Sequence, residues 1–251
     1  TAPAVAIDQA AGPDRNRMLV LTPTPDRLIY EVVGSEPPPM LRSVVQPPTA
    51  TDPGVAAIVQ ALGSASIDPA RPIGGQLADL AVGFVSVRGG TDLQIIRTLD
   101  ATPGVVRLGA TDDQTLWRVV TRPSATQPGE AVPPARVRIT TADGHPITAI
   151  RTTGPHAQLS AAVPAGPAGR LLVVAEAPEW ARAATVTFNG QILTPIPGHV
   201  TPSYALPQEA GSVAIDIPPV RRGWSYAQLV IVALVVFLAV PFGNRRSRRV
   251  S

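Results

Sequence analysis

The first half of the chain alternates short apolar runs with segments of helical periodicity. Residues 55–62 (VAAIVQAL) and 93–100 (LQIIRTLD) carry apolar side chains at helical spacing, each followed by a glycine or proline stop. Residues 81–87 (AVGFVSV) form a short apolar run ending at two glycines, which predicts a buried strand. Because strands and helices alternate, we predict a small α/β subdomain over residues 1–122.

The pattern changes beyond this subdomain. Residues 123–134 are rich in proline and poor in large apolar side chains, which is typical of a linker. Residues 135–141 (ARVRITT) then alternate with period two, and further short apolar runs follow between Pro, Gly and Asn breakers. Asn189-Gly190, between TVTF and QIL, predicts a two-residue hairpin turn. We therefore expect an antiparallel, jelly-roll-like β-sandwich over residues 135–222, and an α+β or mainly β fold for the whole chain.

A hydrophobic run lies close to the end of the chain. Residues 224–243 are long enough to cross a hydrocarbon core of about 30 Å as one helix. Trp224 and Tyr226 stand at its start, where amphipathic rings favour the lipid headgroups. The tail 244–251 is basic through Arg245, Arg246, Arg248 and Arg249. We predict a single transmembrane helix in the cell membrane, with a cytoplasmic C-terminus and the bulk of the chain extracytoplasmic. A buried core helix or a valine-rich strand is the alternative.

The charge distribution restricts the partners of the chain. The net charge is +3, and arginines concentrate on both flanks of the hydrophobic run instead of covering a domain face. We therefore expect the lipid bilayer as a partner and no nucleic acid. All 21 basic residues are arginine, a bias typical of GC-rich bacterial genomes. The chain starts at Thr1 without a charged-then-apolar leader, so we interpret it as a piece of a longer membrane protein.

Few residues are candidates for catalysis. Cysteine is absent, which excludes disulfides, thiolate metal sites and a cysteine nucleophile. His145, His156 and His199 lie in Gly/Pro contexts and read as loop residues, because a metal site would require them to converge with a carboxylate. Neither a nucleophile elbow nor a phosphate loop occurs. We expect no catalytic residue, no metal and no cofactor in this chain.

Trp180 is the strongest candidate for ligand binding. It follows Glu176 and Glu179 in the segment EAPEW, and the predicted hairpin residue Asn189 comes shortly after. A neutral glycan needs an aromatic ring to stack on and a few hydrogen-bonding groups, and these four residues supply both. The alternative is a core tryptophan that seals the sandwich.

Three stretches resemble the C-terminal region of large polytopic family 2 glycosyltransferases of actinobacteria. They are residues 14–23 (DRNRMLVLTP), 77–119 and 163–193. The resemblance implies a parent enzyme of cell-envelope polysaccharide synthesis, whose catalytic domain lies in the cytoplasm ahead of many transmembrane helices. The Asp-x-Asp element of such enzymes has no match in this chain, so no catalytic residue is carried over.

Two functions follow from these observations. The first is a non-catalytic extracytoplasmic module of a membrane glycosyltransferase that contacts the envelope glycan. Its partners would be the glycan and the N-terminal, polytopic part of the same protein or another membrane protein. The second is a structural or partner-binding ectodomain of an envelope complex without affinity for sugar.

Overall fold

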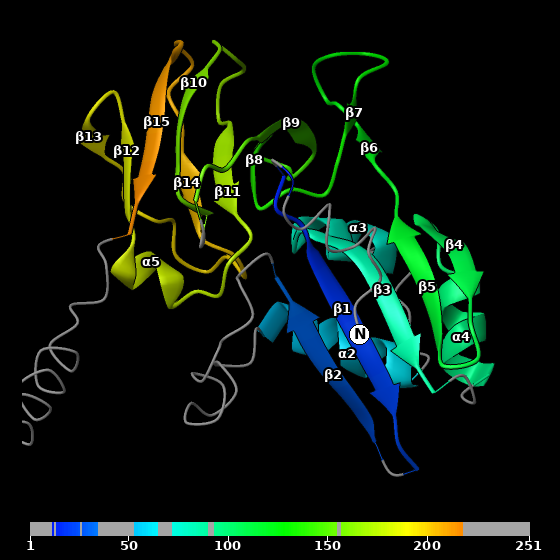
Figure 1. Cartoon of the computed structure of the whole chain (residues 1–251). Helices are drawn as coiled ribbons and strands as arrows, with labels where there is room; N and C mark the ends of the chain where they lie inside the picture. The colour runs from blue at the N-terminus through cyan, green and yellow to red at the C-terminus, as the bar shows by residue number, and fades with distance from the viewer. Residues whose placement is uncertain are drawn as a thin grey trace, which may run out of the picture. The chain divides into compact units, whose positions relative to one another are not determined.

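The chain is mostly β, with several antiparallel sheets and few helices (Figure 1). The computed structural model describes residues 12, 14–25, 27–34, 53–64, 72–89, 93–154 and 157–217. All of them belong to one unit of the chain, residues 1–217. The predicted membrane helix 224–243 and the tail 244–251 lie outside the described residues. Within the described ranges, no helix has the length and apolar character needed to cross a membrane.

A five-stranded mixed sheet forms the first part, with strand order β2-β1-β3-β5-β4. Its strands are β1 (Arg17–Pro23), β2 (Leu28–Val33), β3 (Val82–Arg88), β4 (Val105–Ala110) and β5 (Gln114–Val119). β1 and β3 pair in parallel, and the other neighbours are antiparallel. A parallel pair requires a crossover connection, and the chain between β2 and β3 contains two helices.

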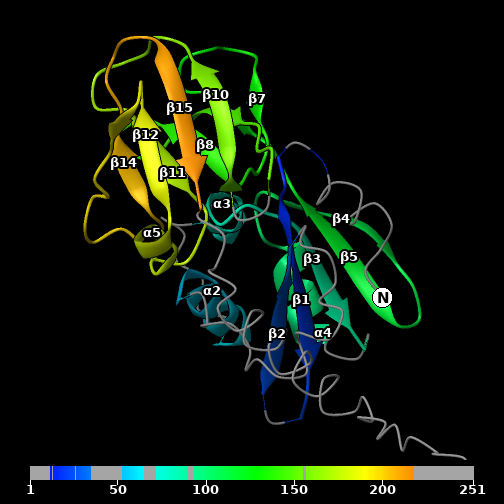
Figure 2. The ribbon, with the colours of Figure 1, turned by 60° about the vertical axis from the view of Figure 1, so that its left-hand side comes forward.

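Three helices cover one face of the mixed sheet (Figures 1 and 2). They are α2 (Pro53–Ser64), α3 (Ile73–Asp79) and α4 (Leu93–Asp100). Their apolar sides pack on alternate strand residues such as Leu19 and Leu21 to form one core. Met18 and Val20 point to the opposite face, as the period of two requires, and pack there with Phe84. The helices predicted at 55–62 and 93–100 and the strand predicted at 81–87 are confirmed.

Helix α3 was not predicted from the sequence. Two adjacent glycines lower its helix propensity, and one of them lies against the turn between α4 and β4. A Cβ on Gly74 would lie 2.4 Å from the carbonyl oxygen of Pro103 and 2.9 Å from Cα of Gly104. The close contact explains why this position requires glycine.

Gly74→Ala is therefore expected to lower the free energy of unfolding by about 1–3 kcal/mol, because backbone atoms must move to admit the methyl group. Gly75→Ala is the matched control, since its Cβ would meet nothing closer than 3.9 Å. That variant should be neutral or more stable by about 0.5–1 kcal/mol, because alanine favours the helix. Urea unfolding of both variants measures the difference, and equal stability would contradict the close contact.

Two four-stranded antiparallel sheets, here called the paired sheets, form the second part. One has the order β10-β15-β12-β13 and the other the order β14-β11-β8-β9. Their strands are β8 (Val137–Thr140), β9 (Pro146–Ile150), β10 (Leu159–Val163), β11 (Leu171–Val174), β12 (Thr185–Phe188), β13 (Gln191–Ile192), β14 (Ser203–Ala205) and β15 (Gly211–Asp216). Side chains from both sheets, including Leu172 and Val213, form one shared core.

The predicted hairpin turn joins β12 and β13. Asn189 has φ 50° and Gly190 has φ 80°, so both turn residues occupy the left-handed region. A type I′ turn requires this conformation at both positions, and Asn-Gly adopts it with little strain. The hairpin prediction is confirmed.

The predicted linker carries a short ribbon of its own, in which β6 (Arg122–Pro123) pairs with β7 (Ala131–Val132). Ser124 Oγ donates a hydrogen bond of 2.7 Å to the carbonyl oxygen of Ile147 in β9. The backbone N–H of Ala125 donates to Pro146 at 2.8 Å. These contacts fasten the segment to the paired sheets.

Candidate functional site

Buried charges connect the mixed sheet to the paired sheets. Glu176, just after β11, accepts from Arg17 Nη2 at 2.7 Å and from Arg136 Nε at 2.6 Å. Arg17 also donates to the carbonyl oxygen of Ala175. The side chains of Arg17 and Arg136 are 7% and 5% exposed. We call these three charged residues the Glu176 network.

A second carboxylate, that of Asp79, forms ion pairs with two further arginines. Asp79, the last residue of α3, contacts Arg122 Nη2 at 2.8 Å and Arg138 Nη2 at 3.2 Å. Arg138 Nη1 also donates to the backbone carbonyl of Asp79 at 2.7 Å. Burial lowers the pKa of Arg138 to about 10, while Asp79 opposes that change and Arg122 adds to it. Arg138 is still charged at neutral pH.

The side of β8 that faces away from the core of the paired sheets carries polar residues. Val137 and Ile139 enter the core of the paired sheets, so the alternating Arg136, Arg138 and Thr140 point away from it. All three are nevertheless buried. Arg136 Nη1 and Arg138 Nε have no hydrogen-bond partner within the described part of the chain. Positive charge therefore exceeds negative charge here, and each carboxylate holds two cations in place.

The four residues predicted to contact glycan occupy different places. The carboxylate of Glu176 lies inside the ion pairs just described. Asn189 Oδ1 accepts from the backbone N–H of Ser212 at 2.8 Å, which ties the hairpin to β15. Trp180 begins α5 (Trp180–Ala183) and packs, half-buried, against the core of the paired sheets. Glu179, beside it, is exposed.

The geometry of β12 separates these residues further. The four-residue strand runs from α5 to the Asn189 turn, a rise of about 13 Å. Figures 1 and 2 both show α5 and the β12–β13 hairpin at opposite ends of this strand. Trp180 and Glu179 are thus neighbours, whereas Asn189 lies at the far end.

The structure describes two of the three predicted loop histidines. His145 and His199 are exposed and lie outside helices and strands, and His156 falls outside the described residues. Across the described ranges, no three His, Cys, Asp or Glu side chains come close enough to hold a metal ion.

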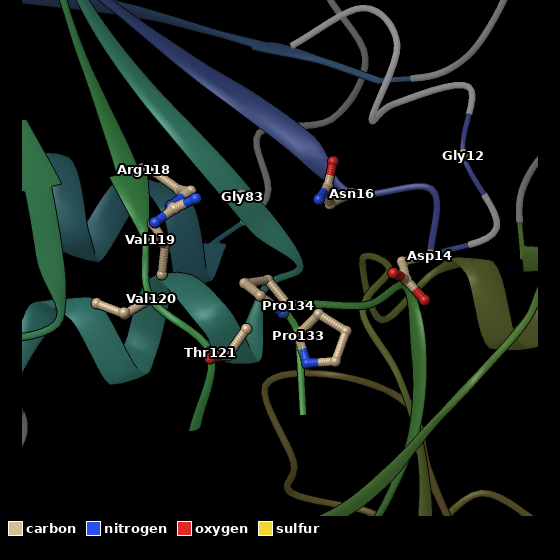
Figure 3. Close-up of a pocket in the computed structure, with 10 residues that line it drawn as sticks. All are labelled: Gly12, Asp14, Asn16, Gly83, Arg118, Val119, Val120, Thr121, Pro133 and Pro134. Atoms are coloured by element: carbon tan, nitrogen blue, oxygen red, sulfur yellow. The ribbon is translucent and has the colours of Figure 1, made fainter. Parts of the chain in front are cut away.

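A cavity of about 540 Å³ lies where β1 and β3 begin and β5 ends (Figure 3). Its polar lining comes from Asp14, Asn16 and Arg118, and its apolar lining includes Pro133 and Pro134. Figure 3 shows Asn16 and Arg118 on either side of Gly83. This cavity was not predicted from the sequence. The polar residues just before β1 were a signal, but their distance from the prolines, more than 110 residues along the chain, hid the connection.

The side-chain amide of Asn16 and the partly buried carboxylate of Asp14 line the cavity. Asn16 is 6% exposed, and a Cβ on Gly83 would lie 2.6 Å from its Nδ2, so glycine is needed to seat that side chain. Burial raises the pKa of Asp14, and Arg151 partly opposes this through space. In the described structure no hydrogen bond or ion pair holds the Asp14 carboxylate. Its backbone carbonyl accepts a hydrogen bond of 3.0 Å from the backbone N–H of Arg136, a residue of the Glu176 network.

Comparison with known proteins yields no relative. No protein-family model, no curated protein and no solved structure matches this chain. The resemblance to glycosyltransferases therefore stays a prediction, and function must be argued from the geometry described above.

Proposed function

We propose that this chain is a non-catalytic, extracytoplasmic module of a membrane glycosyltransferase of cell-envelope polysaccharide synthesis, which guides the glycan. The observation that carries the proposal is the Glu176 network beside a cavity to which Asp14, Asn16 and Arg118 contribute polar groups. Burying three charges is expensive unless their geometry is well fixed. A scaffold fixed in this way can hold a binding surface in position.

The proposed anchor is the helix 224–243, with the arginine tail in the cytoplasm. The finer fold proposed for residues 135–222 is a jelly-roll-like sandwich. It is supported by the shared core of the paired sheets and by the chain's repeated passage from one sheet to the other, for example between β10, β11 and β12.

A structural ectodomain without sugar affinity is the second candidate. It is favoured by the commitment of Glu176 and Asn189 to bonds that hold the fold together. On this view Trp180 serves packing and nothing else.

Trp180→Ala separates the roles assigned to that residue. Because Trp180 is half-buried against the core, we expect a loss of about 1–3 kcal/mol in unfolding free energy, less than for a fully buried ring. Glu179→Ala, its exposed neighbour, is the control and should change stability little. Urea unfolding gives both values. Unchanged stability together with weaker glycan binding would instead make Trp180 a stacking surface.

Deletion of codons 12–217 from the native gene tests the proposed function itself. We expect the amount or the chain length of an envelope polysaccharide to fall, because the growing glycan loses its guide. Sugar analysis of the isolated envelope measures this. An unchanged polysaccharide, or sugar transfer from a nucleotide donor by the purified chain alone, would contradict the proposal.

A further inference from the structure

We propose that the cavity lined by Asp14, Asn16 and Arg118 is a binding site for a neutral saccharide. This inference rests on the proposed function and assigns the glycan contact to this cavity instead of to Trp180.

The three polar groups that line the cavity match the hydroxyls of a sugar in shape. A carboxylate, a carboxamide and a guanidinium are planar groups with two or more acceptors or donors side by side. Neighbouring hydroxyls on a sugar ring present the same paired pattern of donors and acceptors. Asn16 is buried and packs over Gly83, and a site whose polar groups are positioned in advance loses less entropy on binding.

The charged residues of the cavity favour an uncharged ligand. Asp14 and Arg118 have opposite charges, and they are the charged residues that line the cavity, so neither sign dominates its lining. A phosphate would be repelled by Asp14 and an amine by Arg118. Uncharged hydroxyls can accept from Arg118 and donate to Asp14 at the same time.

The partly buried carboxylate of Asp14 favours a ligand that donates hydrogen bonds. Asp14 is partly buried, and within the described residues its oxygens accept no hydrogen bond. Ligand hydroxyls can donate to these oxygens, a role that no group of the described residues fills. Such groups in cavities are candidates for function for this reason.

The size of the cavity and its apolar wall also fit a sugar. The cavity volume of about 540 Å³ lies within the range typical of small-molecule sites. Pro133 and Pro134 place apolar rings on one side of it, as Figure 3 shows, and the CH groups of a sugar ring can pack on such a surface. The site thus has room for one or two sugar units of a longer glycan.

The test is a binding titration on the full 251-residue chain in a zwitterionic detergent free of sugar. The probes are maltose, cellobiose, lactose and mannobiose, with inorganic phosphate as the charged comparison. The side-chain amide of Asn16, followed by NMR, reports occupancy of the cavity directly. We expect at least one disaccharide to shift this resonance and phosphate to leave it unchanged.

Asp14→Asn and Arg118→Gln should each weaken that binding by about tenfold or more, because a hydrogen bond to a charged group is lost. Asp143→Asn and Arg97→Gln make the same changes at residues that do not line the cavity, and they should leave the binding unchanged. Wild-type affinity in the two cavity variants would overturn the inference.

Stability provides the control for folding. A carboxyl whose folded pKa is raised destabilises the protein at neutral pH, and this effect disappears as the pH falls below its ordinary value of 3.8. Asp14→Asn should therefore be at least as stable as wild type at pH 7, and the difference should vanish in acid. Lost binding in a stable variant is then due to the site.

The outcomes also separate this inference from the proposed function. If a disaccharide binds and Trp180→Ala alone weakens it, the cavity assignment is wrong and the proposed function stands. If no disaccharide or only phosphate shifts Asn16, the cavity assignment fails, and the gene deletion decides the proposed function independently.

Discussion

Replacing Glu176 with glutamine is expected to lower the free energy of unfolding by about 3–5 kcal/mol. The substitution keeps the shape of the side chain and removes its charge. Arg17 and Arg136, whose side chains are 7% and 5% exposed, would then stay buried without a counter-charge. Urea unfolding at pH 7, followed by far-UV circular dichroism, measures the loss.

Glu179→Gln is the matched control, because it makes the same chemical change three residues away on an exposed side chain. We expect its effect to stay within about 0.5 kcal/mol. A loss below about 1 kcal/mol in Glu176→Gln, the value of a surface ion pair, would contradict the buried network. Replacing Arg17, Arg136 and Glu176 together by apolar residues of similar size should restore much of the stability, because no unpaired charge remains.

Trp117→Ala is expected to cost a similar amount, about 3–5 kcal/mol. Trp117 is fully buried between the mixed sheet and its helices. Its indole Nε1–H donates to Asp100 Oδ1 at 2.8 Å, and Arg107 contacts the other Asp100 oxygen at 3.3 Å. The guanidinium carbon of Arg107 lies 5.8 Å from the indole ring centre. The substitution removes a large core side chain and leaves Asp100 with one partner fewer.

Trp117→Phe separates the ring from its hydrogen bond. It keeps most of the apolar volume and loses the indole N–H, so we expect a loss of about 1–2 kcal/mol. Unfolding by guanidinium chloride ranks the two variants. Equal losses would assign the whole effect to the hydrogen bond, and a loss below about 1 kcal/mol in Trp117→Ala would contradict the core position.

Short-range patterns predicted several elements of this chain correctly. The helices α2 and α4 follow from apolar residues at helical spacing, and β3 follows from a β-branched run between glycines. The β12–β13 hairpin follows from Asn189-Gly190, since both residues tolerate positive φ. These features depend on neighbours within a few residues, so the chain order alone contains the information.

Burial of polar groups could not be predicted in the same way. The alternation of residues 135–141 was identified from the sequence, but the polar side of β8 is buried, and Arg138 on that side contacts Asp79 of α3. Glu176 looked like a surface ligand for glycan, and its partner Arg17 lies 159 residues away. Which face of a strand is covered depends on elements that the strand itself does not encode.

The sequence by itself determined the approximate positions of α2, α4 and several strands, and the place of the β12–β13 turn. Only the tertiary structure decided that Glu176 pairs with two arginines, that Gly74 lies against the α4–β4 turn, and that Asp14 shares a cavity with Arg118. The reason is physical. Local conformation is set by neighbouring residues along the chain, whereas desolvation and pairing of charges depend on which distant segments come together when the core forms.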